Sequence, residues 1–292
     1  RPGNRKPQFF KCPGKGVESI MATVNRITIL ALGLIGGSLA MALKKSGFAN
    51  QLVAWGPREA SLKKGLELGV IDSYSLDMAE AIKDADIIVV ATPTRIAETV
   101  LGQLASLVTD DVIITDVASV KGNLLLAAEQ AFGKVPARLV LGHPIAGSEK
   151  SGVEAAKVDL FVNHRVILTP TATTCPQALQ TITDMWQSTG AEISQMAVAE
   201  HDEILAATSH LPHILAYALV DALAGQDDIQ DIFRFAAGGF RDFSRIASSD
   251  PTMWQEICLA NRAAILKMID LFSGQLMDLR AAIDEGDGDA IM

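Results

Sequence analysis

The stretch ITILALGLIGGSLAMALKKSG, residues 27–47, decides the fold. It begins with an apolar run, turns through a glycine segment and continues with apolar residues at helical spacing until Gly47. A strand, a glycine turn and a helix in this order are the opening unit of a dinucleotide-binding α/β sheet. The turn departs from the usual fingerprint, because Ala31 stands where the first glycine is expected, while Gly33 and Gly36 keep the second and third positions.

The residues of this turn predict how a dinucleotide would bind. Gly33 allows the backbone to approach a pyrophosphate, and Gly36 allows the helix to pack closely on the strand. The backbone N–H groups of Leu34 and Ile35 open the helix and would face the phosphates. We expect Ala31 to be tolerated if its φ stays negative. The alternative is a glycine turn that serves only the packing of helix on strand.

Apolar runs alternate with amphipathic ones from residue 27 to about residue 170. The apolar runs are RITILA, QLVAW, ADIIVVAT, DVIITDV, ARLVLG and HRVILTP. Each is hydrophobic on successive residues, which is typical of parallel strands covered on both faces. Helices are predicted between them, over residues 34–46, 58–68, 95–106 and 120–132. This alternation predicts an α/β fold with a doubly wound sheet of the Rossmann type.

The pattern changes near residue 198. One more helix, in CPQALQTITDMWQSTG, and one short strand, AEISQMA, precede the change, and no strand pattern follows it. Apolar residues then recur at helical spacing in ILAATSHLPHILAYALVDALAG and in PTMWQEICLANRAAILKMIDLFSGQLMDLRAAI. We therefore predict a dinucleotide-binding domain over residues 22–198 and an all-α domain over residues 199–292. The last segment is strongly apolar for a surface helix, so we expect it to be buried in a homodimer.

Composition excludes several classes of protein. Hydrophobic residues make up 49% of the 292 residues and charged ones 20%, which suits a packed core. The net charge of −9 argues against nucleic-acid binding, and no apolar run is long enough for a membrane span. Three cysteines without metal or disulfide spacing indicate a reducing compartment, so we expect a cytoplasmic protein. Residues 1–21, basic and rich in Pro and Gly, are expected to be a flexible tail, with Met21 as the expected native start.

Polar residues follow three of the predicted strands. His143 follows RLVLG, Ser119 follows VIITD, and Thr92 and Pro93 close IIVVATP. Ligands bind at the carboxyl edge of open α/β sheets, so we expect these residues to line one cleft. His143 suits proton transfer near neutral pH, and Ser119 would hydrogen-bond a substrate oxygen or a nicotinamide. The alternatives are that Ser119 caps the next helix and that His143 is a structural hydrogen-bonding residue before a proline.

A second cofactor signal lies at the end of the second strand. Twenty residues after Gly36, where NAD enzymes usually carry an acidic residue for the ribose, this chain has Gly56. A missing carboxylate with Arg58 nearby favours the 2′-phosphate of NADP. Glu59 is a nearby carboxylate, although we expect it to open the next helix. The sequence thus predicts NADP rather than NAD, unless Arg58 is only a solvated residue at that helix start.

Two clusters in the helical part bear polar side chains. His210 and His213 share one helix face, and Pro212 between them should kink the helix. No third ligand is evident, so we expect the polar wall of a cleft and no metal. In GGFRDFSRIASSDPTMW, Arg241 and Arg245 follow a glycine break, and a guanidinium pair suits a carboxylate. The alternatives are core histidines bonded to the backbone and surface salt bridges of the arginines.

Taken together, these pieces resemble the prephenate/arogenate dehydrogenase family. LGLIGGS, TDVASVKG, GHPIAGSEKSGVE, HDEILAATSHLPH and GGFRDFSRIASSDPTMW occur in the family's order and spacing, and the resemblance runs from residue 27 to about residue 283. It implies a Rossmann-type domain followed by a helical dimerisation domain. It also implies NAD(P)-dependent oxidative decarboxylation of prephenate to 4-hydroxyphenylpyruvate, or of arogenate to tyrosine, or of both, in tyrosine biosynthesis.

The resemblance implies roles for five residues. His143 is the hydrogen-bond acceptor, or base, for the substrate hydroxyl, and Ser119 lies beside that hydroxyl and the nicotinamide. Arg245 binds a substrate carboxylate, His213 lines the substrate pocket, and Glu149 lies at the pocket mouth.

Two other classes stay open at this point. A β-hydroxyacid dehydrogenase also joins a Rossmann domain to a helical one, but it needs a catalytic lysine on the first long C-terminal helix. HDEILAATSHLPHILAYALVDAL contains none. The other alternative is a dimer that senses nucleotides without catalysis. Ala31 is its only support, while Ser119, His143 and Arg245 argue against it.

Overall fold

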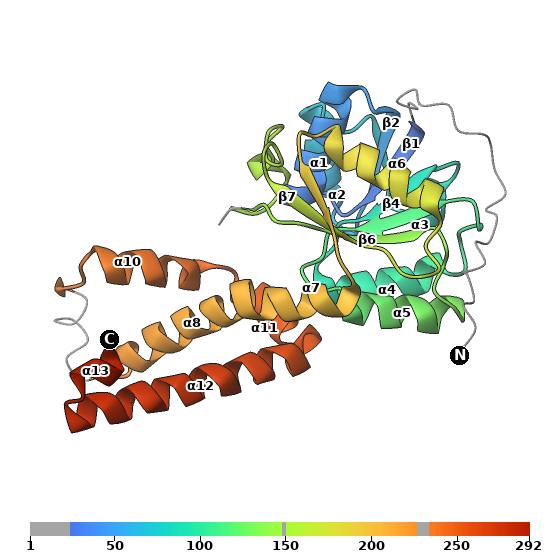
Figure 1. Cartoon of the computed structure of the whole chain (residues 1–292). Helices are drawn as coiled ribbons and strands as arrows, with labels where there is room; N and C mark the ends of the chain where they lie inside the picture. The colour runs from blue at the N-terminus through green and yellow to red at the C-terminus, as the bar shows by residue number, and fades with distance from the viewer. Residues whose placement is uncertain (1–23, 148–149, 227–233) are drawn as a thin grey trace, which may run out of the picture.

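The computed structural model describes residues 24–147, 150–226 and 234–292. These residues form an eight-stranded sheet with helices on both faces, followed by helices that extend away to one side of it (Figure 1). The strands are β1 Val24–Leu30, β2 Ala49–Trp55, β3 Ser73–Ser75, β4 Ile87–Val90, β5 Ile113–Asp116, β6 Leu139–Pro144, β7 Arg165–Thr169 and β8 Glu192–Gln195.

The strand order β3-β2-β1-β4-β5-β6-β7-β8 is that of a doubly wound sheet with two strands added at one edge. The strands β1 to β6 run parallel to one another, as the apolar runs predicted. β7 runs antiparallel to β6, so the prediction of a parallel strand at HRVILTP is wrong. β6 and β7 are joined by a loop with one short 3-10 helix, η1 (Val153–Ala155), in place of a crossover helix. A connection without a crossover helix lets the chain return antiparallel.

Among the described residues, six helices pack on the sheet. They are α1 Leu34–Ser46, α2 Glu59–Glu67, α3 Met78–Ile82, α4 Thr94–Leu104, α5 Gly122–Phe132 and α6 Pro176–Gln187. The sequence pattern predicted α1, α2, α4, α5 and α6, and it missed β3 and α3. These two elements have three and five residues, which is too short to show a period.

The central strand β4 explains why the apolar runs are continuous. Ile87 and Val89 join the core cluster that includes α1 and α6, while Ile88 and Val90 join the cluster that includes α4 and α5. All four side chains are fully buried. Successive side chains of a strand point to opposite faces, so a strand covered on both faces must be apolar at every position. The carboxyl ends of these strands then lie together at one edge of the sheet.

The part of the chain after β8 is helical. Its elements are α7 Val198–Leu205, the π-helical turn η2 Ala206–His210, α8 Leu211–Ala224, α10 Gly238–Ser244, the 3-10 helix η3 Arg245–Ser248, α11 Pro251–Ala260, α12 Arg262–Glu285 and α13 Gly288–Ile291. Within the described ranges no strand follows β8, as predicted. None of the described helices combines the length and the apolar character needed to cross a bilayer.

Three local predictions for this helical part can be compared with the structure. Pro212 lies at the start of α8, directly after the π-helical turn η2, and α7, η2 and α8 follow one another without a gap. Gly238 and Gly239 begin α10, and helical structure is interrupted at residues 236–237, directly before them. The long apolar segment divides at Asn261 into α11 and α12, because the side chain of this buried residue bonds to other elements.

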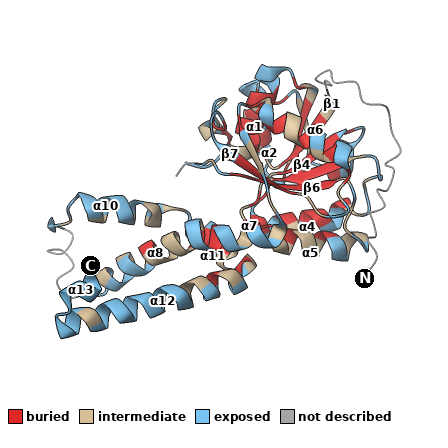
Figure 2. Ribbon diagram, in the orientation of Figure 1, coloured by how far each residue is buried: buried red, intermediate tan, exposed pale blue. Residues whose placement is uncertain are grey.

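The two parts of the chain differ in burial, as Figure 2 shows. Buried residues concentrate on the sheet and on the helices packed against it. Of the 24 residues of α12, Ile265 alone is buried within the described chain. The long helix α12 therefore exposes apolar side chains that the described residues do not cover.

Candidate active site

The glycine turn between β1 and α1 is more strained than the sequence suggested. Ala31 has a φ of +78°, so the condition under which we expected alanine to be tolerated here is not met. The turn follows β1 directly, since Ala31 N donates to Trp55 O at 2.7 Å, and it must reverse within three residues before Leu34. A left-handed backbone at a residue with a Cβ costs about 1–2 kcal/mol. The structure thus explains why glycine is the usual residue here.

The two glycines of the turn are kept for different physical reasons. A Cβ on Gly36 would lie 2.6 Å from the carbonyl oxygen of Ala31 and 3.1 Å from Cβ of Ala91, so packing alone requires glycine there. A Cβ on Gly33 would meet no atom of the described residues within 4 Å. Packing therefore accounts for Gly36 and leaves Gly33 unexplained, while the open space beside Gly33 gives a ligand access to the backbone.

The N-terminus of α1 has no acceptor of its own among the described residues. No side chain caps it, and its first turn contains no acidic residue. The N–H of Gly37 bonds to Gly33 O at 2.9 Å, so the N–H groups of Leu34 and Ile35 precede the first hydrogen bond inside the helix. Free N–H groups at the positive end of a helix dipole are suited to an anion such as a phosphate.

Thr92 and Pro93 lie beside this turn. The N–H of Ala91 donates to Leu30 O at 2.9 Å, which ties the end of β4 to the end of β1. Pro93 occupies the N-cap position of α4. Thr92 is buried, and its hydroxyl has no hydrogen-bond partner within the described part of the chain. A buried hydroxyl in this state is uncommon, and a bound group in the cleft would satisfy it.

The end of β2 carries the residues that bear on the choice of dinucleotide. The carboxylate of Glu59 accepts a hydrogen bond from the Tyr74 hydroxyl at 3.2 Å and pairs with Lys63 at 3.2 Å. The hydrogen bond from Lys63 lowers the pKa of Glu59. Glu59 thus opens α2, as predicted, and its carboxylate is engaged within the helix and by β3. Arg58 is exposed at the N-cap of the same helix, two residues beyond Gly56.

His143 lies at the carboxyl end of β6 and is buried. Its Nδ1 is 2.9 Å from Nε2 of His201 in α7, and Nδ1 of His201 is 2.8 Å from Oδ1 of Asp202. Burial, followed by the charge of Lys121 and the neighbouring histidines, holds the pKa of His143 well below its usual range. The imidazole is therefore neutral at physiological pH, and a neutral imidazole can accept a proton.

A buried ion pair fixes the strand ends next to this histidine. The ammonium group of Lys121 pairs with the carboxylate of Asp116 and donates to Gly142 O at 2.7 Å. Asp116 also accepts from the N–H of Gly142 at 3.0 Å and from that of Ala118 at 2.8 Å. These bonds join the ends of β5 and β6 and hold the loop that carries Ser119.

The structure tests whether Ser119 caps the helix that follows it. α5 begins at Gly122 with Lys121 in the N-cap position, and no side chain of α5 or its cap bonds the free N–H groups. Asp202 from α7 accepts from the N–H of Lys121 at 2.9 Å and from that of Gly122 at 2.8 Å. The N-cap interpretation of Ser119 is therefore wrong, and Ser119 is half-buried in the loop after β5.

Two histidines of the helical part, His210 and His213, lie against Trp254 in α11. His210 is buried, and its Nδ1 is 3.2 Å from Nδ2 of Asn261. Burial lowers the pKa of His210 to about 4. His213 donates from Nδ1 to Ser209 O at 2.8 Å, and its ring stacks on Trp254 with centroids 3.9 Å apart. The alternative of a core histidine bonded to the backbone thus describes neither residue in full. His210 is buried but bonds to a side chain, and His213 bonds to the backbone but is only half-buried.

The charge of Arg245 acts on His213. Burial is the main cause that lowers the pKa of His213, and the charge of Arg245 lowers it further. Arg245 begins η3, directly after α10, which contains Arg241. Glu149 lies outside the described residues. Among the described residues, no three histidine, cysteine or acidic side chains are arranged to hold a metal ion.

Sequence reasoning missed several residues of this site: Asp116, Lys121, His201, Asp202, Trp254 and Asn261. His201 and Asp202 were part of the quoted segment HDEILAATSHLPH, so their residue types were visible. Their burial against β6 and α5 was not visible, because it depends on how α7 docks on the sheet.

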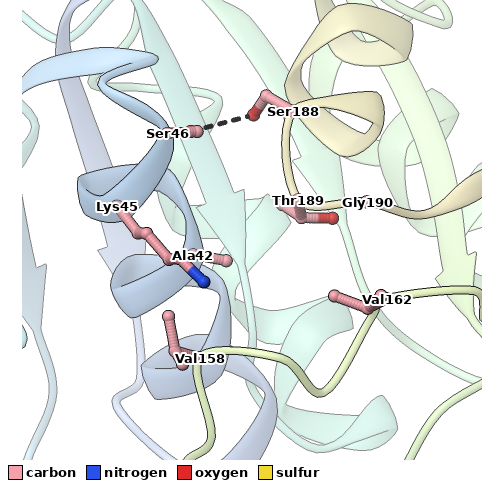
Figure 3. A pocket seen from close by; sticks show the side chains of 8 residues that line it. All are labelled: Ala42, Lys45, Ser46, Val158, Val162, Ser188, Thr189 and Gly190. Atoms are coloured by element: carbon pink, nitrogen blue, oxygen red, sulfur yellow. Dashed lines mark hydrogen bonds between the residues drawn. The ribbon is translucent and has the colours of Figure 1, made fainter.

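A separate hollow of about 220 Å³ lies at the far end of α1. Figure 3 shows it between Lys45 and Ser46 of α1, Val158 and Val162 of the loop before β7, and the turn after α6, where Ser46 bonds to Ser188 at 3.3 Å. It includes none of the residues described above, so it is not the candidate active site.

Comparison with known proteins identifies the family of the chain. The nucleotide-binding domain of prephenate dehydrogenase, as a family model, matches residues 39–195, and the dimerization domain of prephenate dehydrogenase matches residues 197–292. A cyclohexadienyl dehydrogenase of Zymomonas mobilis is 36% identical over 275 residues, which is 93% of each chain. A prephenate dehydrogenase of Bacillus subtilis is 38% identical over 267 residues, which is 90% of this chain and 71% of the relative. The chain belongs to the prephenate dehydrogenase family.

Solved structures of this family share the whole architecture. The prephenate dehydrogenase of Aquifex aeolicus, in complex with hydroxyphenyl propionate and NAD+, has a TM-score of 0.86 at 35% identity and covers 94% of this chain and 95% of its own. The arogenate dehydrogenase of Synechocystis has a TM-score of 0.78 at 31% identity and covers 90% and 94%. Family membership confirms the resemblance inferred from the motifs and decides against a β-hydroxyacid dehydrogenase.

Proposed function

We propose that the chain is an NAD(P)-dependent dehydrogenase that converts prephenate to 4-hydroxyphenylpyruvate and CO₂. The observation that carries the proposal is the neutral, buried His143 at the carboxyl edge of the dinucleotide-binding sheet. Membership of the prephenate dehydrogenase family supplies the substrate. In this proposal residues 22–198 bind the dinucleotide, and residues 199–292 complete the substrate pocket and form the dimer.

The reaction needs three changes at the substrate ring. The C4 hydroxyl loses its proton to His143, C4 loses a hydride, and the carbon–carbon bond to the ring carboxylate breaks to release CO₂. The electron pair of that bond leaves a phenolate oxygen on the ring, which takes the proton back from His143 to give the phenol of the product. A bound nicotinamide supplies the acceptor for the hydride. Aromatisation of the ring drives the reaction, so the protein's task is to remove one proton and to align the reactants. Ser119, at the end of the neighbouring strand, is assigned to hydrogen-bond the same hydroxyl.

The helical part supplies the anion-binding side of the pocket. Arg245 is assigned to a substrate carboxylate, because a guanidinium group binds a carboxylate in bidentate fashion. His213 is assigned to the pocket wall, where its ring is held by stacking on Trp254 and by the bond to Ser209 O. Glu149 is assigned to the pocket mouth on the resemblance alone.

The dinucleotide is assigned to the turn between β1 and α1. The backbone around Gly33, Leu34, Ile35 and Gly36 would bind the pyrophosphate, since this backbone is open and the helix end is uncapped. Thr92 and Pro93 would line the same cleft. The aligned N–H groups would hold the charge of the phosphates without a basic side chain.

NADP is the dinucleotide that we propose as preferred. Gly56 offers no carboxylate for the ribose hydroxyls, and the carboxylate of Glu59 is engaged by Lys63 and Tyr74. Arg58 is exposed beside this position and would pair with a 2′-phosphate.

We also propose that the chain forms a homodimer through α12. Phe272, Leu276, Leu279 and Ile283 form a stripe along α12 at helical spacing, and their side chains are 37%, 53%, 42% and 61% exposed. A second copy of the chain would cover this stripe, as the match to a dimerization domain suggests.

A single assay tests the proposed reaction. Purified protein is given prephenate or arogenate, each with NAD and with NADP, and the absorbance of the reduced dinucleotide is followed. We expect turnover with prephenate, and faster turnover with NADP than with NAD. Equal or faster turnover of arogenate would identify the dual-specificity or arogenate alternative, which the Zymomonas and Synechocystis relatives favour. No turnover in all four combinations would contradict the proposal.

A further inference from the structure

The proposed reaction uses only one of the two ring nitrogens of His143. The other, Nδ1, is 2.9 Å from Nε2 of His201, whose own Nδ1 is 2.8 Å from Oδ1 of Asp202. Both histidine rings are buried, with exposures of 8% and 0%. The three side chains thus form one hydrogen-bonded line that ends at His143.

The ionisation of Asp202 determines which atom donates in each hydrogen bond of this line. Asp202 is ionised: burial raises its pKa, but the hydrogen bonds from His201 and from the N–H groups of Lys121 and Gly122 outweigh this effect and lower it. An ionised carboxylate can only accept hydrogen bonds, so Nδ1 of His201 must carry the proton. When the His201 ring carries only this proton, its Nε2 is an acceptor, and Nδ1 of His143 must donate to it.

We propose that Asp202 and His201 are positioning residues that fix the tautomer of His143, so that its Nε2 has a free lone pair for the substrate proton. The proposal rests on the proposed function of His143 and adds two residues that touch neither substrate nor dinucleotide. With the opposite tautomer, Nε2 would carry a proton and could not accept one.

The line also links the two parts of the chain. His143 belongs to the sheet, while His201 and Asp202 belong to α7, the first helix after β8. Asp202 is held in turn by the N–H groups of Lys121 and Gly122 at the start of α5. Correct docking of α7 on the sheet is therefore needed for His143 to have its acceptor tautomer.

The carboxylate of Asp202 has a second role, which follows from the charges around His143. Burial and the charge of Lys121 both disfavour the positive form of His143 and lower its pKa. When His143 takes the substrate proton, its Nδ1–H still donates to His201, and the carboxylate of Asp202 is the nearest negative group along the line. The carboxylate stabilises the imidazolium that forms, as in other imidazole–carboxylate pairs.

The test replaces Asp202 by asparagine, which keeps the size of the side chain. An amide can donate to Nδ1 of His201. The proton of His201 would then lie on Nε2 and point to His143, and the proton of His143 would lie on its own Nε2. We expect kcat for Asp202→Asn to fall by about a hundredfold or more, while KM for both substrates changes by less than about threefold. Glu203→Gln is the matched control: the neighbouring carboxylate is exposed and pairs with Lys267 at 3.4 Å, and its loss should leave kcat unchanged.

A nitrogen NMR measurement reads the tautomer without any substrate. The protein is labelled with ¹⁵N-histidine, and the signals of His143 are assigned by comparison with His143→Asn. We expect an unprotonated Nε2 in the wild type and a protonated Nε2 in Asp202→Asn. If the wild type turned over neither substrate, the proposed function would fail, yet this spectrum would still test the line of hydrogen bonds.

A second variant tests the proposal if Asp202→Asn does not fold. If Asp202→Asn does not fold, His201→Phe keeps a ring of similar size and removes the acceptor for Nδ1 of His143, and the same loss of kcat is expected. A folded variant of either kind with the kcat of the wild type would overturn the proposal. So would an Asp202→Asn spectrum in which the tautomer of His143 is unchanged.

Discussion

The sheet and the outer helices bury their apolar residues in opposite ways. In β4 every residue is fully buried, and the helices of the same chain provide the cover. In α12 the apolar stripe is exposed, and Ile265 alone is buried within the described chain. The sheet thus buries its apolar residues under helices of the same chain, whereas the described residues leave the apolar stripe of α12 uncovered. The proposed active site nonetheless takes His143 from the sheet and Arg245 and His213 from the helical part.

The largest effect is expected on the dimer Kd when glutamate replaces apolar residues of the α12 stripe. In the double variant Leu276→Glu, Ile283→Glu, each protomer loses two apolar contacts and buries two carboxylates. We expect the dimer Kd to rise by more than about a hundredfold, which corresponds to about 3 kcal/mol. Analytical ultracentrifugation over a range of concentrations measures it. Leu126→Glu, on the exposed face of α5, is the control and should stay dimeric. A double variant with unchanged Kd would place the dimer contact elsewhere.

The two glycines of the turn sharpen the comparison within the sheet domain. Gly36→Ala forces a Cβ against Ala31 O, so its free energy of unfolding should fall by about 2 kcal/mol. Gly33→Ala meets no atom of the described residues, so its stability should stay within about 0.5 kcal/mol of the wild type, while KM for NADP rises about tenfold. Denaturant titration and steady-state kinetics separate the two. Equal losses of stability would show that both glycines serve packing.

Gly56 tests which dinucleotide the sheet edge accepts. A Cβ there would lie 3.7 Å from Leu62 and 3.9 Å from Ala31, which are ordinary contacts. Gly56→Asp supplies a carboxylate that bonds a ribose and repels a 2′-phosphate, so kcat/KM for NAD relative to NADP should rise by about tenfold or more. Arg58→Ala should weaken NADP alone. If neither variant changed the ratio, the argument for NADP would be wrong.

The smallest effect concerns the strained turn. Ala31→Gly relieves a φ of +78° and should raise the free energy of unfolding by about 1 kcal/mol. Ala60→Gly is the control, because Ala60 lies exposed in α2 and glycine should destabilise that helix by about 1 kcal/mol. Thermal or denaturant unfolding measures both. A loss of stability in Ala31→Gly would contradict the strain.

The sequence predicted those features that depend on local pattern. The apolar runs predicted the strands because both faces of the sheet are covered, and the position of His143 and Ser119 after two such runs predicted that they share one edge. The antiparallel direction of β7 was not predictable, since an apolar run has the same appearance in either direction. The positive φ of Ala31 was missed for a similar reason, because it is imposed by the tight path between β1 and α1.

The contacts between the two parts of the chain were the least predictable. Asp202 replaces the expected Ser119 as the partner of the free N–H groups of α5, although the two residues are far apart in the sequence. Asn261 interrupts a segment whose apolar period is continuous, because its side chain bonds to Asp202 O and lies beside His210. Such bonds depend on docking, and a pattern within one segment contains no information on it.

The central claim is that a neutral His143, held between sheet and helices, accepts the substrate proton. The most direct measurement is kcat and the substrate Kd of His143→Asn, with His164→Asn as the control at an exposed histidine. The account predicts that His143→Asn binds prephenate within about threefold of the wild type and loses about 10²–10⁴-fold in kcat, while His164→Asn is unchanged. A His143→Asn variant that binds prephenate and turns it over at the wild-type rate would contradict the account.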